Sequence, residues 1–184
     1  MPAYSIEARS FCIALAWCHN FWVLKNADSG ATIAELHGLA YDRIHQKILP
    51  IGTTQAHALR VFLFPHDAAY AEEVGRPLYT TRMYGKSRAH VVHRDVDSLA
   101  RWQAAVNAMP LLDALDLTYP PFGFNVRSPT VNSNSAYRTF GEIMDVPVYD
   151  FPRVFRPGFE NCMIAADEIA AAKYRAGDRS RRAA

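Results

Sequence analysis

Cysteine is scarce in this sequence, and its spacing suggests no cross-link. Cys12, Cys18 and Cys162 are odd in number, and no two of them form a Cys-x-x-Cys pair. Neither a disulfide framework nor a structural zinc site is therefore predicted. We expect a soluble protein that folds in a reducing compartment and holds no metal ion.

Long hydrophobic runs are missing as well. The longest run near the N-terminus, FCIALAWC at 11–18, is too short to span a bilayer. No basic segment precedes it, as a signal peptide would require. The sequence thus predicts no integral membrane segment and a protein that is cytoplasmic as synthesised. Any export would use a secretion system that needs no signal peptide.

Charge of one sign is not concentrated in the expected folded part either. The formal net charge is +2, and the segment from Lys173 to the end holds five basic residues and one acidic residue. We expect 173–184 to be a frayed basic tail. The segment RMYGKSRAHVVHR (82–94) is the one local exception, and a solvated strand face explains it better than phosphate binding. Nucleic acid is therefore not an expected partner.

The chain does contain enough apolar material for one core. Half of its 184 residues are hydrophobic and 21% are charged, which fits one α+β domain over residues 1–172. Alternation, turn residues and helix caps predict an antiparallel sheet with packed helices. The expected strands cover 11–25, 32–39, 57–64, 77–85 and 88–94, and the expected helices cover 66–75, 97–109, 135–145 and 165–176, with Pro110 kinking or restarting the second helix.

Two of the expected strands carry polar residues in an apolar setting. Strands 11–25 and 32–39 form a hairpin across NADSGA (26–31). If Phe21 lies opposite Glu35, then His19 lies opposite His37 on the same face. An imidazole in an apolar strand is costly unless it has a partner or a function. Glu35 and His37 are both candidates to fix the tautomer of His19, and the pattern does not decide between them.

The segment VNSNSAYRTF (131–140) opens a predicted helix with four small polar residues. Asn and Ser are preferred N-caps, so capping alone would explain the pattern. The first turn of a helix is also where free N–H groups and the positive end of the dipole stabilise an oxyanion. Ser133 is therefore a candidate nucleophile, and Asn132 and Asn134 are candidate oxyanion donors.

The order of these residues resembles the circularly permuted papain-like fold group, which includes the lecithin retinol acyltransferase family, the PPPDE peptidases and the related NlpC-type amidases. In that group a strand histidine and a polar residue on the next strand precede a helix that opens with Asn-Cys-Asn or Asn-Cys-Glu. Here NSNSAY places Ser133 at the cysteine, CHNFWVL places His19 as the base, and AELHG places His37 or Glu35 as the orienting residue.

The resemblance implies a permuted papain-like topology and an acyl hydrolase or transferase. Such an enzyme acts on an amide, peptide or ester bond through a covalent acyl-enzyme and needs no cofactor. Aromatic side chains would line a cleft for a peptide- or lipid-like substrate, namely Phe21, Trp22, Phe122, Phe124 and Tyr137. The sequence also resembles uncharacterised bacterial domains associated with secreted effectors. That second resemblance implies an effector toxin with an immunity or adaptor protein as partner.

Three alternatives stay open. Cys162 lies near a predicted helix start, but no histidine is near it in the sequence. His90 and His93, with Asp95 and Asp97, would ligate a metal only from a helix, which AHVVHRD does not predict. The loops YPPFGF and VYDFPRVFRPGF, rich in Pro and Phe, would also suit a catalytically inactive binding or adaptor protein on the same scaffold.

Overall fold

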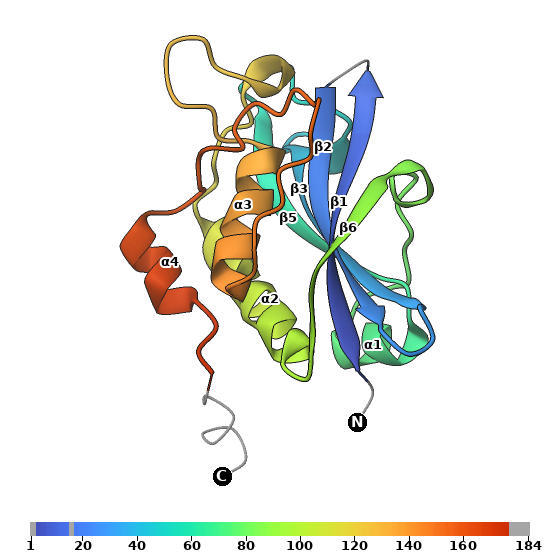
Figure 1. Ribbon diagram of the computed structural model, residues 1–184. Helices are drawn as coiled ribbons and strands as arrows, with labels where there is room; N and C mark the ends of the chain where they lie inside the picture. The colour runs from blue at the N-terminus through green and yellow to red at the C-terminus, as the bar shows by residue number, and fades with distance from the viewer. Residues whose placement is uncertain (1–2, 15–16, 177–184) are drawn as a thin grey trace.

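The computed structural model describes residues 3–14 and 17–176 (Figure 1). The predicted α+β class with an antiparallel sheet is confirmed. Within the described residues the strands are β1 Tyr4–Ala14, β2 Trp17–Asn26, β3 Thr32–Asp42, β4 Lys47–Leu49, β5 His57–Pro65 and β6 Arg88–Asp95. The α-helices of the same part of the chain are α1 Ala68–Glu73, α2 Ser98–Ala114, α3 Ser133–Met144 and α4 Ala166–Ala172, and single 3-10 turns lie at Tyr84–Lys86 and Pro121–Gly123.

One edge of β3 pairs with two strands in succession, β2 and β4. The order of the sheet over the described strands is β4-β3-β2-β1-β6, and β5 also pairs with β3. Leu36 pairs with both Trp22 and Leu63, and Ala40 pairs with both Leu49 and Leu59. Strands β2 and β4 therefore share one edge of β3, and β5 occupies the other edge. Between the two partners β3 has no strand on that edge, because β2 leaves it beyond Trp22.

Two predicted strands need correction. The segment 11–25 is not one strand, because β1 and β2 meet there in a hairpin that pairs Cys12 with Cys18. The second predicted hairpin does not form, since 77–83 is irregular and β6 pairs with β1 instead. The N–H of Tyr79 donates to Pro65 O at 2.9 Å, and Thr81 bonds a buried carboxylate described below. Tyr79 and Thr81 thus bond this segment to β5 and β3 rather than to β6.

The predicted helices are all present, with altered bounds. Helix α2 runs through Pro110 without a break. Asp97 makes no side-chain cap bond to α2, because its carboxylate binds His93 and Arg101. Residues 177–184 of the predicted basic tail lie outside the described residues. Within the described part of that segment, the N–H of Tyr174 donates to Ile143 O at the end of α3.

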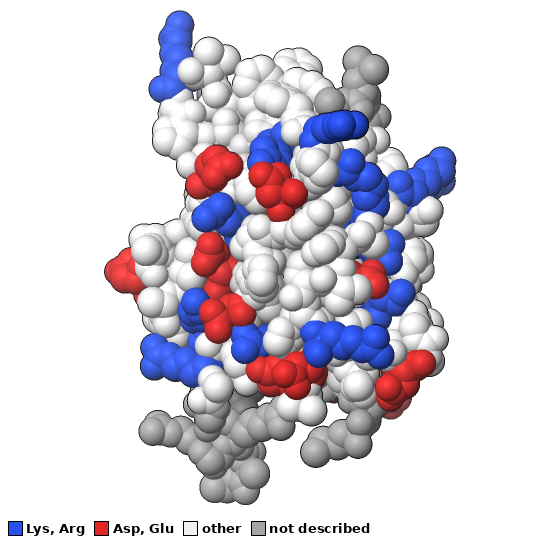
Figure 2. Space-filling view, viewed as in Figure 1, with Lys and Arg blue, Asp and Glu red and all other residues white. Residues whose placement is uncertain are grey.

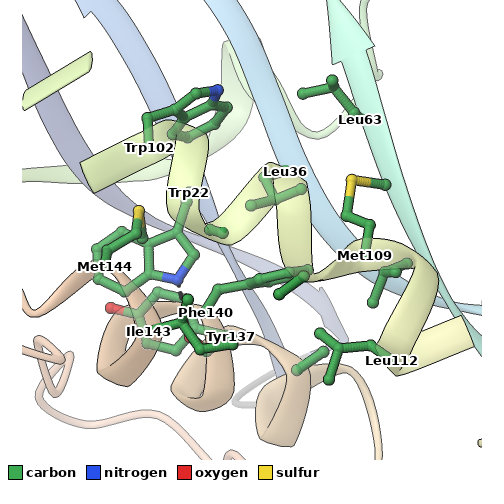
Figure 3. Close-up of a cluster of buried hydrophobic side chains, with 14 of the residues drawn as sticks. Trp22, Leu36, Leu63, Trp102, Met109, Leu112, Tyr137, Phe140, Ile143 and Met144 are labelled. Carbon is green, nitrogen blue, oxygen red and sulfur yellow. Dashed lines mark hydrogen bonds between the residues drawn. The ribbon is translucent and has the colours of Figure 1, made fainter. Parts of the chain in front are cut away.

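Helices α2 and α3 cover one face of the sheet and form the main core with it (Figures 1 and 3). The Trp22 ring stacks on Tyr137 with centroids 4.4 Å apart, and its Nε1–H donates to Tyr137 O at 2.8 Å. Gly141 lets α3 approach this ring, because a Cβ there would lie 2.8 Å from Trp22. The core residues drawn in Figure 3 include Trp22, Leu36, Leu63, Trp102, Met109, Leu112, Tyr137, Phe140, Ile143 and Met144.

The cysteine prediction was wrong for one pair. Cys12 and Cys18 form a disulfide across the β1–β2 hairpin, while Cys162 is a free thiol. The prediction relied on the odd number of cysteines, and it did not consider that antiparallel pairing could place Cys12 opposite Cys18. Residues opposite each other in neighbouring strands bring their Cβ atoms within disulfide range whatever their spacing along the chain.

No helix among the described residues is long and apolar enough to cross a membrane. The face shown in Figure 2 mixes basic and acidic side chains and carries no field of one sign.

The disulfide closes a short loop, and we expect Cys12→Ala to lower the free energy of unfolding by about 2 kcal/mol, the value that loop-closure entropy gives for a ring of this size. The measurement is urea unfolding with and without a phosphine reductant. Wild type in reductant should match the variant, and Cys162→Ala should leave the reductant effect unchanged. Alkylation of air-purified, denatured wild type should modify one thiol, and modification of three would contradict the cross-link.

Candidate active site

A cavity opens where β2 separates from β3. Its volume is about 530 Å³, and its lining includes His19, Tyr119, Asn132, Ser133 and Asn134. The first turn of α3 and the first half of β2 thus meet at one end of the molecule, the top in Figure 1. The structure brings together the histidine and the serine that the sequence singled out, although 113 intervening residues separate them.

The cap of α3 is made without Ser133. The Asn132 side chain accepts a hydrogen bond from the N–H of Asn134 at 2.8 Å. Ser135 Oγ accepts from the N–H of Asn132 at 3.1 Å, which completes a capping box. Asn132 and the second serine of NSNS therefore account for the cap. Ser133 occupies the first helical position and is left for another role.

Asn134 fixes the start of α3 to the free edge of β2. Its Oδ1 accepts from the N–H of Asn20 at 3.0 Å, and its Nδ2 donates to Cys18 O at 3.1 Å. Nδ2 also donates to Pro157 O at 3.2 Å. The two β2 groups flank His19, so one amide side chain replaces the missing strand partner. This pairing places the first turn of α3, and with it Ser133, on the same cavity as His19.

Gly38 allows α3 to lie directly on β3. A Cβ built at Gly38 would be 2.3 Å from the Ala136 Cβ and 3.4 Å from the Ser133 Cα. Real side-chain atoms do not approach so closely, so a glycine at 38 and a small residue at 136 are both required by this packing. The contact sets the height of Ser133 above the strand that carries His37.

A chain of buried side-chain hydrogen bonds connects His19 on β2 with His37 and Glu35 on β3. His19 Nε2 lies 2.9 Å from His37 Nδ1, and His37 Nε2 lies 2.8 Å from Glu35 Oε2. Glu35 also accepts bonds from Thr81 N at 3.2 Å and Thr81 Oγ1 at 2.6 Å, and from His66 Nε2 at 2.5 Å. His19, Glu35 and His37 are all at least 96% buried. We refer to His19, His37 and Glu35 together as the relay.

The relay determines which nitrogen of His19 can act as a base. An ionised carboxylate only accepts hydrogen bonds, so His37 must carry its proton on Nε2 and accept at Nδ1. His19 must then donate from Nε2, which leaves the lone pair of the neutral ring on Nδ1. His19 Nδ1 has no hydrogen-bond partner among the described residues, and it is not among the polar atoms that are fully buried without a partner. Since His19 lines the cavity, this nitrogen faces the cavity.

The pKa shifts agree with these protonation states. Burial alone would raise the pKa of Glu35, but the bonds from His37, His66 and Thr81 outweigh it and lower the pKa to about 2. Burial, with the neighbouring His37, holds the pKa of His19 well below its ordinary value. Burial also lowers the pKa of His37 in spite of its bond to Glu35. At neutral pH the relay consists of one carboxylate and two neutral imidazoles.

Ser133 is not hydrogen-bonded to His19. Its Oγ lies 3.3 Å from the hydroxyl of Tyr119, which is its one side-chain hydrogen bond within the described residues. Tyr119 is 5% exposed, and burial raises the pKa of its phenol, so the O–H proton stays in place at neutral pH. The sequence reasoning missed Tyr119 as a site residue, because it treated Tyr119 only as the first residue of the YPPFGF loop.

The strand register differs from the expected one by two residues. Glu35 pairs with Val23 rather than with Phe21. A shift of two keeps every side chain on its face, so the expected cluster forms all the same. Glu35 and His37 do not compete for His19, since they act in series. His66 and Thr81 were also missed, because both reach Glu35 from outside the hairpin.

Several predicted site residues have other surroundings. Trp22 and Tyr137 are buried in the core and do not line the cavity. Both donor hydrogens of the Asn132 amide are used, since Nδ2 bonds Gly123 O and Pro157 O. The Asn134 amide is fully used as well, so neither asparagine side chain is free to bind an oxyanion. Of the predicted aromatic lining only Phe122 lies on the cavity, while Phe21 stacks on His37 and Phe124 contacts Trp17.

The alternative metal and thiol sites gain no support. His93 Nε2 lies 2.7 Å from Asp97 Oδ1, in a pair on the opposite side of β1 from β2. Cys162 is half-buried, and burial raises the pKa of its thiol, which disfavours a nucleophilic thiolate.

Searches with the whole chain find no matching family model, no matching curated protein and no matching solved structure. We therefore argue its function from the geometry of the site.

The Gly38 contact can be tested by a single added methyl group. Gly38→Ala should push α3 away from β3 and cost about 1–3 kcal/mol of unfolding free energy, as overpacking does in tight interfaces. Thermal and urea unfolding measure this loss. Gly85→Ala is the matched control, because a Cβ there meets no atom within 4 Å. The double variant Gly38→Ala/Ala136→Gly should recover part of the loss, and no recovery would argue against this contact.

The buried neutral histidines should make folding sensitive to mild acid. Because their folded pKa values lie below those of the unfolded chain, the unfolded state takes up protons first as the pH falls below about 6.5. Stability should then fall with decreasing pH, by about 1.4 kcal/mol per pH unit for each such histidine. The Glu35 contribution follows lower, between about 4.5 and about 2.

Urea unfolding between pH 7 and pH 5 checks this dependence. His19→Gln should reduce the slope of stability against pH by about 1.4 kcal/mol per unit. His90→Gln, at an exposed position on β6, should keep the wild-type slope. An unchanged slope in His19→Gln would mean that folding does not lower the pKa of His19.

Proposed function

We propose that the protein is an acyl hydrolase or acyltransferase that cleaves an ester, amide or peptide bond. Ser133 is the nucleophile, His19 the general base, and His37 with Glu35 the orienting pair. One observation carries the proposal: the buried relay leaves the Nδ1 lone pair of His19 facing the cavity that Ser133 lines. A buried carboxylate and two buried imidazoles are costly to maintain for packing alone.

The first chemical step forms a bond between Ser133 Oγ and the carbonyl carbon of the substrate. The hydroxyl proton moves to His19 Nδ1, because a serine hydroxyl is too weak an acid to lose its proton without a base in the same step. The resulting imidazolium donates from Nε2 to His37, and the charge of Glu35 stabilises it through that ring. His19 then gives the proton to the leaving group, and the acyl-enzyme remains.

A second step releases the acyl group. Water gives hydrolysis, and an alcohol or amine gives transfer. The incoming nucleophile loses its proton to His19 Nδ1, and Ser133 Oγ regains a proton as it leaves. Both steps use the same base, so the chain needs no further titratable group.

The oxyanion donors in this proposal are the N–H of Ser133 and the hydroxyl of Tyr119. The amide side chains of Asn132 and Asn134 are fully bonded elsewhere. The dipole of the twelve-residue helix α3 adds positive potential at the same point. The proposal requires the Ser133 hydroxyl to leave its Tyr119 contact and to turn toward His19 when substrate binds. Catalytic hydrogen bonds often tighten only in the substrate complex.

The same observations support the permuted papain-like topology. The base lies on β2, the orienting residues lie on β3, and the nucleophile opens a helix far downstream that packs on both strands. We include this topology in the proposal.

The disulfide supports export to an oxidising compartment, because disulfides persist there and are rare in the cytosol. An exported bacterial effector is one setting that fits. The reducing compartment expected from the cysteine count is the poorer match.

A non-catalytic binding protein is the second candidate. The observation that favours it is the hydrogen bond of Ser133 to Tyr119 rather than to His19. A binding protein would keep the cavity and the relay as parts of its fold, and would turn over no substrate.

Active-site titration separates these candidates. A fluorophosphonate probe should label wild type at Ser133, with the site read by peptide mass spectrometry. His19→Ala should lower the labelling rate by about 10²–10⁴-fold, the usual contribution of a general base. Ser133→Ala should abolish labelling, and both variants should retain the wild-type circular dichroism spectrum.

Ser135→Ala is the matched control, since it removes the neighbouring serine and its part in the cap. It should cost about 1 kcal/mol of stability and keep labelling. If wild type is labelled no faster than Ser133→Ala, the result would contradict the hydrolase proposal and favour the binding protein.

A further inference from the structure

The cavity beside Ser133 has a wall chemistry that restricts what the substrate can be. Most of its described lining is apolar, including Leu39, Ile48, Leu49, Ile51, Met83 and Phe122. None of the described lining residues is acidic, and Arg82 is the only Lys or Arg among them. A charged peptide would find little to pair with here, and an apolar chain would lose water on most sides.

The mouth of the cavity is also apolar. Ile48, Tyr79 and Phe122 all line the cavity, yet expose 41%, 54% and 60% of their surfaces. Large exposed apolar side chains around a pocket are typical of sites that receive an apolar ligand. The three come from β4, from the 77–83 segment and from the turn after Pro120, so separate parts of the chain contribute to one apolar rim.

Arg82 is an unpaired cation at this rim. Its side chain is exposed, and it makes no hydrogen bond, ion pair or ring contact with any described residue. Its neighbour Thr81 is anchored to Glu35 by backbone and side chain, so the position of Arg82 along the rim is fixed. A guanidinium without an internal partner beside an apolar cavity favours an anionic group on the ligand.

From these features we infer that the site takes an anionic amphiphile, with its apolar acyl chain in the cavity and its negative group at Arg82. The inference rests on the proposed function in naming this amphiphile as the acyl donor. At roughly 30 Å³ for a group the size of a water molecule, a cavity of about 530 Å³ accepts a chain of about eight to twelve carbons together with its ester group.

Binding to the Ser133→Ala variant tests the ligand class without any turnover. The probes are decyl phosphate, decyltrimethylammonium and ethyl phosphate, each below its micelle concentration and measured by isothermal titration calorimetry. Decyl phosphate should bind at least a hundredfold more tightly than ethyl phosphate, since each buried methylene strengthens binding by about three- to fourfold. It should also bind roughly fivefold more tightly than the cationic decyl compound, the upper range for one exposed ion pair.

Two further variants locate the binding. Arg82→Ala should abolish the preference for the anion and Arg82→Lys should keep most of it, while Arg76→Ala, an exposed arginine outside this cavity, should change nothing. Ile51→Trp should fill the cavity and remove the chain-length dependence, and Ile48→Trp, at a more exposed lining position, serves the same purpose if Ile51→Trp does not fold. Equal binding of the two decyl compounds, or equal effects of the Arg76 and Arg82 variants, would overturn the inference.

Failure of this inference and failure of the proposed function give different results. Decyl phosphate binding without probe labelling of wild type at Ser133 would keep the ligand class and remove the enzyme. Labelling at Ser133 without decyl phosphate binding would keep the enzyme and remove the amphiphile as its substrate.

Discussion

The amide of Asn134 bonded across the edge of β2 is the contact on which the arrangement of the site depends. It accepts from Asn20 and donates to Cys18, in place of the strand that would otherwise pair there. The strand edge left open by the separation of β2 from β3 would be an unsatisfied row of N–H and C=O groups. The same separation creates the cavity. The Asn134 side chain thus satisfies two groups of the open edge and holds Ser133 on the same cavity as His19.

The second constraint is the charge of Glu35 in the interior of the protein. A buried carboxylate is tolerated only when donors surround it, and here they come from His37, His66 and Thr81. The ionised carboxylate in turn determines the His37 tautomer, and through it the tautomer of His19. Thr81 also ties the irregular 77–83 segment to the sheet, so the residue that helps to ionise Glu35 also fixes one wall of the cavity.

The parts of this site that could be predicted were those with local signals. His19 stood out because an imidazole is unusual in an apolar strand, and Ser133 because NSNS holds more polar residues than a cap needs. The parts that could not be predicted depend on long-range pairing. Tyr119, His66 and the pairing of β6 with β1 have no periodicity or motif that marks them. The disulfide was missed because its prediction relied on spacing along the chain, while strand register decides which cysteines meet.

A hydroxyl nucleophile depends more on a neighbouring base than a thiol nucleophile does. A cysteine at 133 could exist in part as the thiolate and react before any base acts, whereas a serine must transfer its proton as it attacks. A lone histidine whose pKa is lowered by burial is a weak base for that transfer. The charge of Glu35, passed through His37, favours the protonated form of His19 as it develops, and so opposes the effect of burial. In the proposed mechanism a serine at 133 therefore depends on all three relay residues, and a cysteine there would depend on them less.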